Sequence, residues 1–316
     1  MALIYNAAKT GILDGTVDLD TDTLVCVLLR ADGAFVPVYE PDNVTMADML
    51  AQGGATGNEE VSVGGYLRVT LASITASEED SGGSPANTAR VEAGKAVFSA
   101  LLTGQTAGAA VVYRQVGAAG PAGDATHEVV GFYETGNIPT NGGDIEIRYA
   151  GVDGIGDWVR LQSATNIYNR ALFNLATGVY DLNDAGQTYR VLLLRNDGGG
   201  PPVFDPDHNF VSDVLAPATS VELTVGGYAR QAVTGRTVTQ NDTADRAEAK
   251  ASKVTFLALA TGQEIGAAVL FKFETVDADS PLVGFFELSD TPTNTGDIEI
   301  LFDGVDGVGD FLRLTE

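Results

Sequence analysis

The chain has 316 residues, 44% of them hydrophobic, which is enough for two ordinary domains with their own cores. Its single cysteine, Cys26, excludes an internal disulfide framework and a metal site built from several thiolates. The 43 acidic and 18 basic side chains give a formal net charge of -25, which repels phosphate backbones, so we expect no nucleic-acid partner. The opening segment MALIYNAAKTGILDG lacks the order of a signal peptide, and no stretch approaches ~18 uninterrupted apolar residues, so we also expect no membrane segment.

The first predicted element is a short helix, because Ile4, Ala8 and Ile12 recur at helical spacing before Gly15. The apolar run LVCVLLR, residues 24–30, follows it and is typical of a central strand that is covered on both faces. Beyond it the sequence consists of short β segments separated by Gly, Pro and Asn turns, namely YLRVTLASIT, AVFSALL, AAVVYRQV, EVVGFYE, DIEIRYA and WVRL. No second helical period recurs between these segments, which disfavours the crossovers of a parallel sheet.

All of these elements occur twice. The closing block IPTNGGDIEIRYAGVDGIGDWVRL, residues 138–161, is identical at 16 of 24 positions to TPTNTGDIEILFDGVDGVGDFLRL, residues 291–314. Shorter pairs precede it in the same order: IYN at 4 and 167, VSVGGYLR at 61 and LTVGGYAR at 223, TGQTAGAAVVY at 103 and TGQEIGAAVLF at 261, VGFYE at 130 and VGFFE at 283. We therefore predict two repeat units, residues 1–163 and 164–316. The first carries insertions at residues 76–88 and 117–126, which are rich in turn-forming residues.

About seven short strands per unit predict an all-β, mainly antiparallel fold. The expected architecture is two tandem domains, each with one short N-terminal helix. Each domain is expected to be either a β-sandwich or a small barrel, and the pattern leaves both alternatives open.

No catalytic motif is recognisable, and we expect neither an enzyme nor a cofactor. The histidines His127 and His208 lie in loop segments without a counterpart in the other unit. We expect both to be surface residues without a catalytic role, since a general base needs a positioned partner and a pocket.

The weak candidate for a metal site is the loop DGVDGVGD, where Asp303, Asp306 and Asp310 would surround a hard cation such as calcium. The first unit has Ala150 at the position of Asp303, and the loop lacks the closing glutamate of an EF-hand. A glycine-rich connection with solvated aspartates is therefore the favoured interpretation.

Two further motifs are interpreted as scaffold. The acidic segment DLDTD, residues 18–22, has the chemistry of a turn before the central strand. The repeated GGY, at residues 64–66 and 226–228, predicts a tight approach in which a glycine adopts a positive φ and the tyrosine packs.

Several segments together carry a resemblance to a known family: YNAAKTGILDGTVDLDTDT, LTVGGYARQAVTGRTVTQNDTADRAEA, GAAVLFK, SPLVGFFEL and GDIEILFDGVDGVGDFLRL. In their order along the chain they resemble small virion structural proteins, capsid decoration-like, of tailed bacteriophages. The similarity covers most of each unit, whereas the members of that family are mostly one unit long.

The resemblance implies a capsid decoration protein that binds the major capsid protein or other virion proteins on the outer surface of the shell. It further implies a homo-oligomer, with a trimer suspected because three two-unit chains supply six units. Two alternatives stay open: a ring component of the phage neck or tail, and a calcium-dependent carbohydrate-binding or adhesion module.

Overall fold

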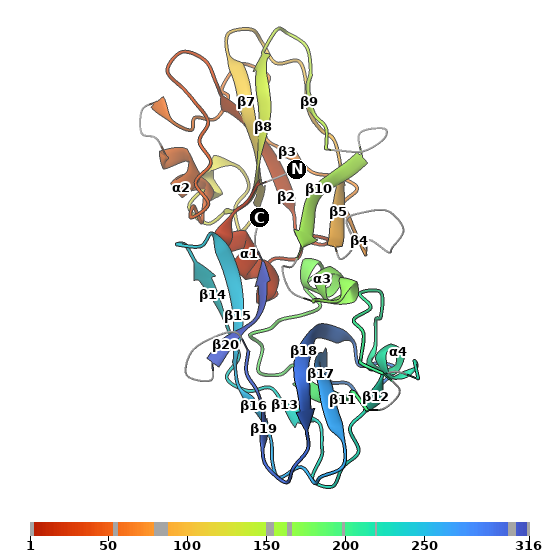
Figure 1. Ribbon diagram of the computed structural model, residues 1–316. Helices are drawn as coiled ribbons and strands as arrows, with labels where there is room; N and C mark the ends of the chain where they lie inside the picture. Colours follow the sequence, from red (N-terminus) through yellow and green to blue (C-terminus); the bar gives the residue numbers. More distant parts are fainter. Residues whose placement is uncertain are drawn as a thin grey trace.

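A computed structural model of the chain (Figure 1) describes residues 3–52, 56–78, 88–149, 155–162, 166–197, 200–218, 220–302 and 308–314. Short strands dominate these residues, and all the strand pairs are antiparallel, which confirms the predicted all-β, mainly antiparallel class. No helix in this part of the chain is long and apolar enough to cross a membrane.

The first half forms a five-stranded sheet in the order β1-β8-β7-β2-β3, a three-stranded sheet β10-β5-β4, and the pair β6-β9. Its elements are β1 (Leu3–Ile4), α1 (Asn6–Leu13), β2 (Leu24–Arg30), α2 (Met46–Ala51), β3 (Val69–Thr70), β4 (Thr75–Glu78), β5 (Thr88–Gly94), β6 (Ala96–Phe98), β7 (Thr106–Arg114), a 3-10 helix (Pro121–Gly123), β8 (Glu128–Pro139), β9 (Ile145–Ile147) and β10 (Ile155–Gln162).

The second half repeats this plan with the sheet β12-β11-β17-β18, in which β13 also pairs with β11, the sheet β14-β15-β20, and the pair β16-β19. Its elements are α3 (Asn169–Ala176), β11 (Tyr189–Arg195), α4 (Val211–Leu215), β12 (Val221–Glu222), β13 (Gln231–Ala232), β14 (Thr237–Asn241), β15 (Arg246–Ser252), β16 (Val254–Phe256), β17 (Glu264–Lys272), β18 (Leu282–Pro292), β19 (Ile298–Ile300) and β20 (Val308–Leu314). In both halves the described strands form sheets with two free edges that do not close into a ring, which is typical of layered sheets.

The predicted central strand β2 is covered on both faces. Its alternate side chains enter two different cores, because successive residues of a strand point to opposite sides. Leu24, Cys26 and Leu28 join a large central cluster, whereas Val25, Val27 and Leu29 join a smaller one with Met46 and Met49 of α2. Strand β11 divides its side chains between two cores in the same way.

The predicted short N-terminal helix of each unit is confirmed as α1 or α3, and each half also holds a second short helix that was not predicted, α2 or α4. Both are shorter than two turns and bury only two side chains, so they leave no apolar period in the sequence. Helix α2 does leave a local signal, a capping box. The Thr45 hydroxyl accepts a hydrogen bond from the Asp48 amide at 3.2 Å, and the Asp48 carboxylate accepts one from the Thr45 amide at 3.0 Å.

The first helix of each half, α1 or α3, packs against the three-stranded sheet of the other half (Figure 1). Helix α1 contacts β14 and β15, and α3 contacts β4, β5 and β10. Matching backbone hydrogen bonds accompany this exchange: the Leu19 amide donates to the Ala176 carbonyl at 2.9 Å, and the Leu182 amide donates to the Leu13 carbonyl at 3.0 Å. The contact is therefore reciprocal, as in a two-fold pair of subunits.

The exchange joins the two halves through one large hydrophobic cluster. Ala8 and Ile12 of α1 belong to it together with Ala247, Ala249 and Ala251 of β15, all of them buried. The boundary near residue 163, taken as a division between separate domains, stays a prediction.

The shared core predicts a large effect of truncating a side chain in either exchanged helix. Ile12→Ala and Leu175→Ala each remove a fully buried side chain, and we expect each to lower the free energy of unfolding by about 2 to 5 kcal/mol. Urea unfolding measures the free energy of unfolding of each variant. Leu67→Ala, at a side chain that is 77% exposed, is the control and should change stability little. A loss below about 1 kcal/mol in both helix variants would contradict the packing described.

Candidate functional site

The GGY motif of the first half builds a tight turn, as its sequence indicates. Gly65 has a φ of +88°, and a Cβ atom there would lie 2.7 Å from the Ala100 carbonyl oxygen, so only glycine fits. The Tyr66 hydroxyl accepts a hydrogen bond from the Leu28 amide at 3.0 Å and donates one to the Glu60 carboxylate at 2.8 Å. The motif therefore ties the turn to the central strand β2.

The second half repeats this turn with the same partners. Gly227 has a φ of +87°, and a Cβ atom there would lie 2.9 Å from the Ala258 carbonyl oxygen. The Tyr228 hydroxyl accepts from the Leu193 amide at 3.1 Å and donates to Glu222 at 2.7 Å. The interpretation of GGY as a scaffold turn with a packing tyrosine is confirmed in both halves.

An arginine two residues after each GGY completes an ion-pair network, which is largely buried in the first half. Arg68 Nη2 lies 2.6 Å from Glu60 Oε2, and Arg68 Nη1 lies 2.5 Å from Asp124 Oδ1. The guanidinium also lies over the Tyr113 ring, 5.4 Å from its centre. Burial alone would lower the pKa of Arg68, but hydrogen bonds to Asp124 and Glu60 raise it above its ordinary value.

The second half holds the same network around Arg230. Its guanidinium lies 2.6 Å from Glu222 and 2.5 Å from Asp277, over the ring of Phe271. The hydrogen bond from Arg230 lowers the pKa of Asp277. Sequence reasoning missed both networks, because Asp124 and Asp277 lie in segments where the two units do not align. The available signal was the arginine that follows GGY in both copies, in GGYLR and GGYAR.

His127 is fully buried, so the expectation that it lies on the surface is wrong. Its ring stacks on Tyr113 with centroids 4.8 Å apart; Nδ1 accepts from the Val116 amide at 3.2 Å, and Nε2 lies 3.2 Å from the Gly120 carbonyl oxygen. Most of the insertion before it, residues 117–126, is exposed, as its Gly and Pro content predicts. Its 3-10 helix nevertheless packs Gly123 against the imidazole.

His208 is partly exposed, and its Nε2 lies 3.7 Å from Asp205 Oδ2, three residues earlier in the chain. The two histidines therefore occupy separate places in separate halves. The structure gives each of them local partners within its own loop.

The calcium hypothesis stays a prediction. Asp303 and Asp306 lie outside the described residues. Of Asp310, in β20, only the backbone is described. Among the residues that the structure does describe, no group of three or more His, Cys, Asp or Glu side chains is arranged to hold a metal ion.

The acidic segment before β2 is a turn, in agreement with its interpretation. One carboxylate oxygen of Asp18 accepts hydrogen bonds from the amides of Asp20, at 2.9 Å, and Thr21, at 3.1 Å. Asp22 in turn accepts from the Asp18 amide at 2.9 Å and pairs with Arg114 at 2.7 Å. These carboxylates satisfy backbone donors and a cation of their own half.

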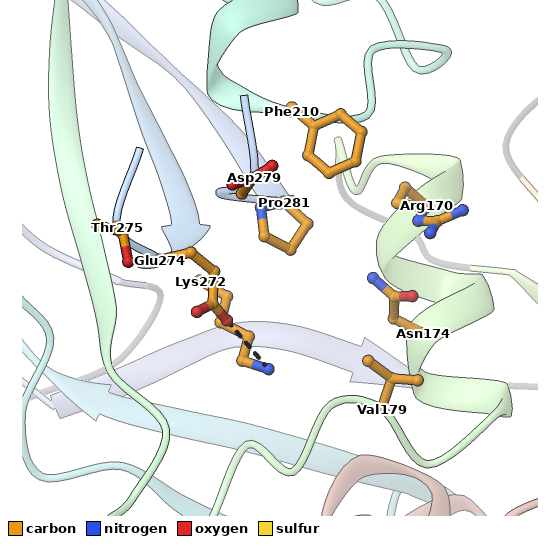
Figure 2. A pocket seen from close by; sticks show the side chains of 9 residues that line it. All are labelled: Arg170, Asn174, Val179, Phe210, Lys272, Glu274, Thr275, Asp279 and Pro281. Carbon is orange, nitrogen blue, oxygen red and sulfur yellow. Dashed lines mark ion pairs between the residues drawn. The ribbon is translucent and has the colours of Figure 1, made fainter. Parts of the chain in front are cut away.

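A pocket of about 330 Å³ opens beside α3 (Figure 2). Arg170 and Asn174 of α3 form one wall, and the turn between β17 and β18 forms the opposite one with Glu274 and Asp279. Lys272 lies in the floor, with its Nζ 3.6 Å from Glu274. Arg170 pairs with Glu78 at 2.6 Å, so both cations of the pocket have a carboxylate partner within the chain. Such pairing is typical of structural ion pairs.

The first half carries different side chains at the corresponding positions. Ala7 and Gly11 stand where α3 has Arg170 and Asn174, and Arg114 stands where β17 has Lys272. Arg114 pairs with Glu128 at 2.8 Å as well as with Asp22. A second pocket, of about 270 Å³, lies elsewhere in the first half, between residues 31–37 and strands β7 and β8. The two halves thus share a scaffold and differ in the side chains at these positions.

Comparisons of the chain with models of known families, with curated proteins and with solved structures find no match.

Glu248 of β15 lies in a further network, close to where α1 packs. Its side chain is 3% exposed and lies 2.6 Å from Arg246 and 2.7 Å from Lys250. Burial alone would raise the pKa of Glu248, but hydrogen bonds from Lys250, Asn241 and Arg246 lower it to about 2.

Replacement of Arg68 should destabilise the protein strongly. In Arg68→Met the nearly buried carboxylates of Glu60 and Asp124 lose their cation, and we expect a loss of about 3 kcal/mol in the free energy of unfolding. Arg148→Met, at an ion pair whose arginine is 67% exposed, is the matched control and should cost below about 1 kcal/mol. Equal losses in chemical denaturation would refute a structural role of the Arg68 network.

The lowered pKa of Glu248 predicts a specific pH dependence. A carboxyl group with a lower pKa in the folded state contributes stability above its unfolded pKa, near 4.5, and loses it as the pH falls toward 2. We expect Glu248→Gln to remove about 2 kcal/mol of this acid-sensitive stability. The free energy of unfolding, measured from pH 6 to pH 2.5, tests this prediction. Glu287→Gln, at an exposed side chain, is the control. Parallel pH profiles for wild type and Glu248→Gln would exclude the effect.

Proposed function

We propose that the protein is a non-enzymatic structural protein of a tailed bacteriophage virion, bound as a decoration protein to the outer face of the capsid. The observation that carries the proposal is the nature of the repeated motifs. The segments that resemble phage virion proteins hold turns and strand ends in place through contacts that recur in both halves, as at Tyr66 and Tyr228. Such a protein needs a rigid scaffold with variable surface loops.

The charge of the chain supports the same proposal. A net charge of -25 keeps a protein dispersed at the high local concentration of a particle surface. It also favours attachment to surfaces that carry basic side chains. We therefore propose the major capsid protein as the partner, contacted by the loops in which the two halves differ.

A trimer remains part of this proposal. Each chain is a closed pair, because its halves give each other reciprocal contacts. Three chains around a threefold axis would therefore be three such pairs, joined by contacts of a different kind from those between the halves.

Copy number in purified virions tests the location. A shell protein should be present at on the order of hundreds of copies, in fixed ratio to the major capsid protein. Quantitative mass spectrometry of purified particles measures this ratio, and cryo-electron microscopy locates the density. A handful of copies at one vertex would identify a neck or tail ring instead, and absence from the particle would refute a virion role.

Removal of calcium separates the decoration protein from an adhesion module. We expect the thermal unfolding midpoint to be the same in calcium and in excess chelator, since a ligand raises stability only if it binds the folded state. A midpoint that rises with calcium in the wild type, and does not rise in Asp306→Asn, would favour the adhesion module.

A further inference from the structure

The contacts between the two halves are reciprocal in their backbone and apolar parts but not in their charges. On one side, Lys9 of α1 reaches into the second half, where its Nζ donates to the Asp245 carbonyl oxygen at 2.8 Å. The same Nζ donates to Asn6 Oδ1 at 3.1 Å, and the side chain is almost completely buried. A buried ammonium group needs such acceptors, because its desolvation is costly without them.

On the other side, the cation comes from a different position of the helix. Arg170 of α3 reaches into the first half and pairs with Glu78 of β4, with Nη1 2.6 Å from Oε1. The arginine is about one third exposed and the glutamate less so. In these two described contacts the cations come from unequal positions of the two helices.

The repeat shows what a pair of like halves would contain instead. Alignment on the IYN motifs places Leu172 at the position of Lys9 and Ala7 at the position of Arg170. In a pair of first halves, Ala7 would face Glu78, which would lose its guanidinium. In a pair of second halves, Leu172 would face the Asp245 carbonyl, which would lose its ammonium donor.

The acceptor for Arg170 is also particular to the first half. In the register of β4 and β5, Glu78 lies opposite Ala89. At the matching position of the second half, opposite Ala247, the residue is Gln240. In a pair of second halves Arg170 would therefore face a neutral amide. The apolar core and the backbone hydrogen bonds suit any pairing, whereas both cations favour unlike halves.

We propose that the interface between the halves is an association surface specific for unlike halves, which holds them together without a covalent connection. The partner that fits the β4-β5-β10 sheet is the α3 helix of the second half of the same chain. Apolar burial supplies the affinity, and Lys9 and Arg170 supply the selectivity, because specificity is a difference between the affinities of competing pairs.

A full-length chain with a protease site placed at residues 163–165 tests the proposal. After cleavage of the folded protein, native mass spectrometry should show one complex with one copy of each half. The cleaved sample is then unfolded in urea and returned to buffer. Random pairing would give about half unlike complexes, and we expect more than about nine tenths.

The double variant Lys9→Leu with Arg170→Ala carries at each position the residue of the opposite unit. It keeps the apolar interface, so its unlike fraction after refolding should fall toward the random value of about one half. The control is the double variant Lys253→Leu with Arg148→Ala, which removes cations from exposed pairs within single halves. After refolding, this control should form the same fraction of unlike complexes as the wild type.

Two results would overturn the proposal. Separation of the halves on cleavage in native buffer would show that the connection holds them together, and this measurement needs no refolding. Random sorting of the wild type, or equal sorting in the two double variants, would show that the two cations do not select the partner.

Discussion

The packing of each terminal helix on the sheet of the opposite half is the contact on which the rest of the structure depends. Helices of eight residues, like α1 and α3, are too short to be stable alone in water, and a three-stranded sheet needs a cover for its apolar face. Each half therefore supplies what the other lacks. The central cluster that results contains the inward side chains of both β2 and β11, so the five-stranded sheets also rest on the exchange.

Side-chain polar interactions fall into two kinds at the features that the halves share. At the GGY turns they are duplicated: Arg68 and Arg230 occupy equivalent networks with the same acceptor types, and Tyr66 and Tyr228 make equivalent bonds to the central strand. The charged side-chain contacts between the halves, by contrast, are unequal. Interactions that hold a turn in place were retained in both copies, whereas the positions that face the other half carry different side chains. The duplicated networks shape the scaffold, and the unequal contacts distinguish its two sides.

Features that depend on neighbouring residues in the chain could be predicted from the sequence. The run LVCVLLR indicated a strand with two buried faces, the IYN segments indicated a helix, and GGY indicated a turn that requires glycine. Features that depend on distant residues could not. Nothing in the composition of the insertion before His127 shows that it folds back to bury the ring, and helices α2 and α4, shorter than two turns, leave no apolar period. The exchange of helices was equally invisible, because α1 has the same apolar pattern whichever sheet it covers.

Fusion of the two units has a consequence for how the surface of this protein can change. In a pair of identical chains every substitution appears twice, so a new hollow on one side is matched by the same hollow on the other. Here the hollow beside α3 is lined by Arg170 and Lys272 of the second half, and the first half has Ala7 and Arg114 at the matching positions. One gene thus encodes two paired halves whose surfaces can differ, and a mutation in either half is inherited independently of the other.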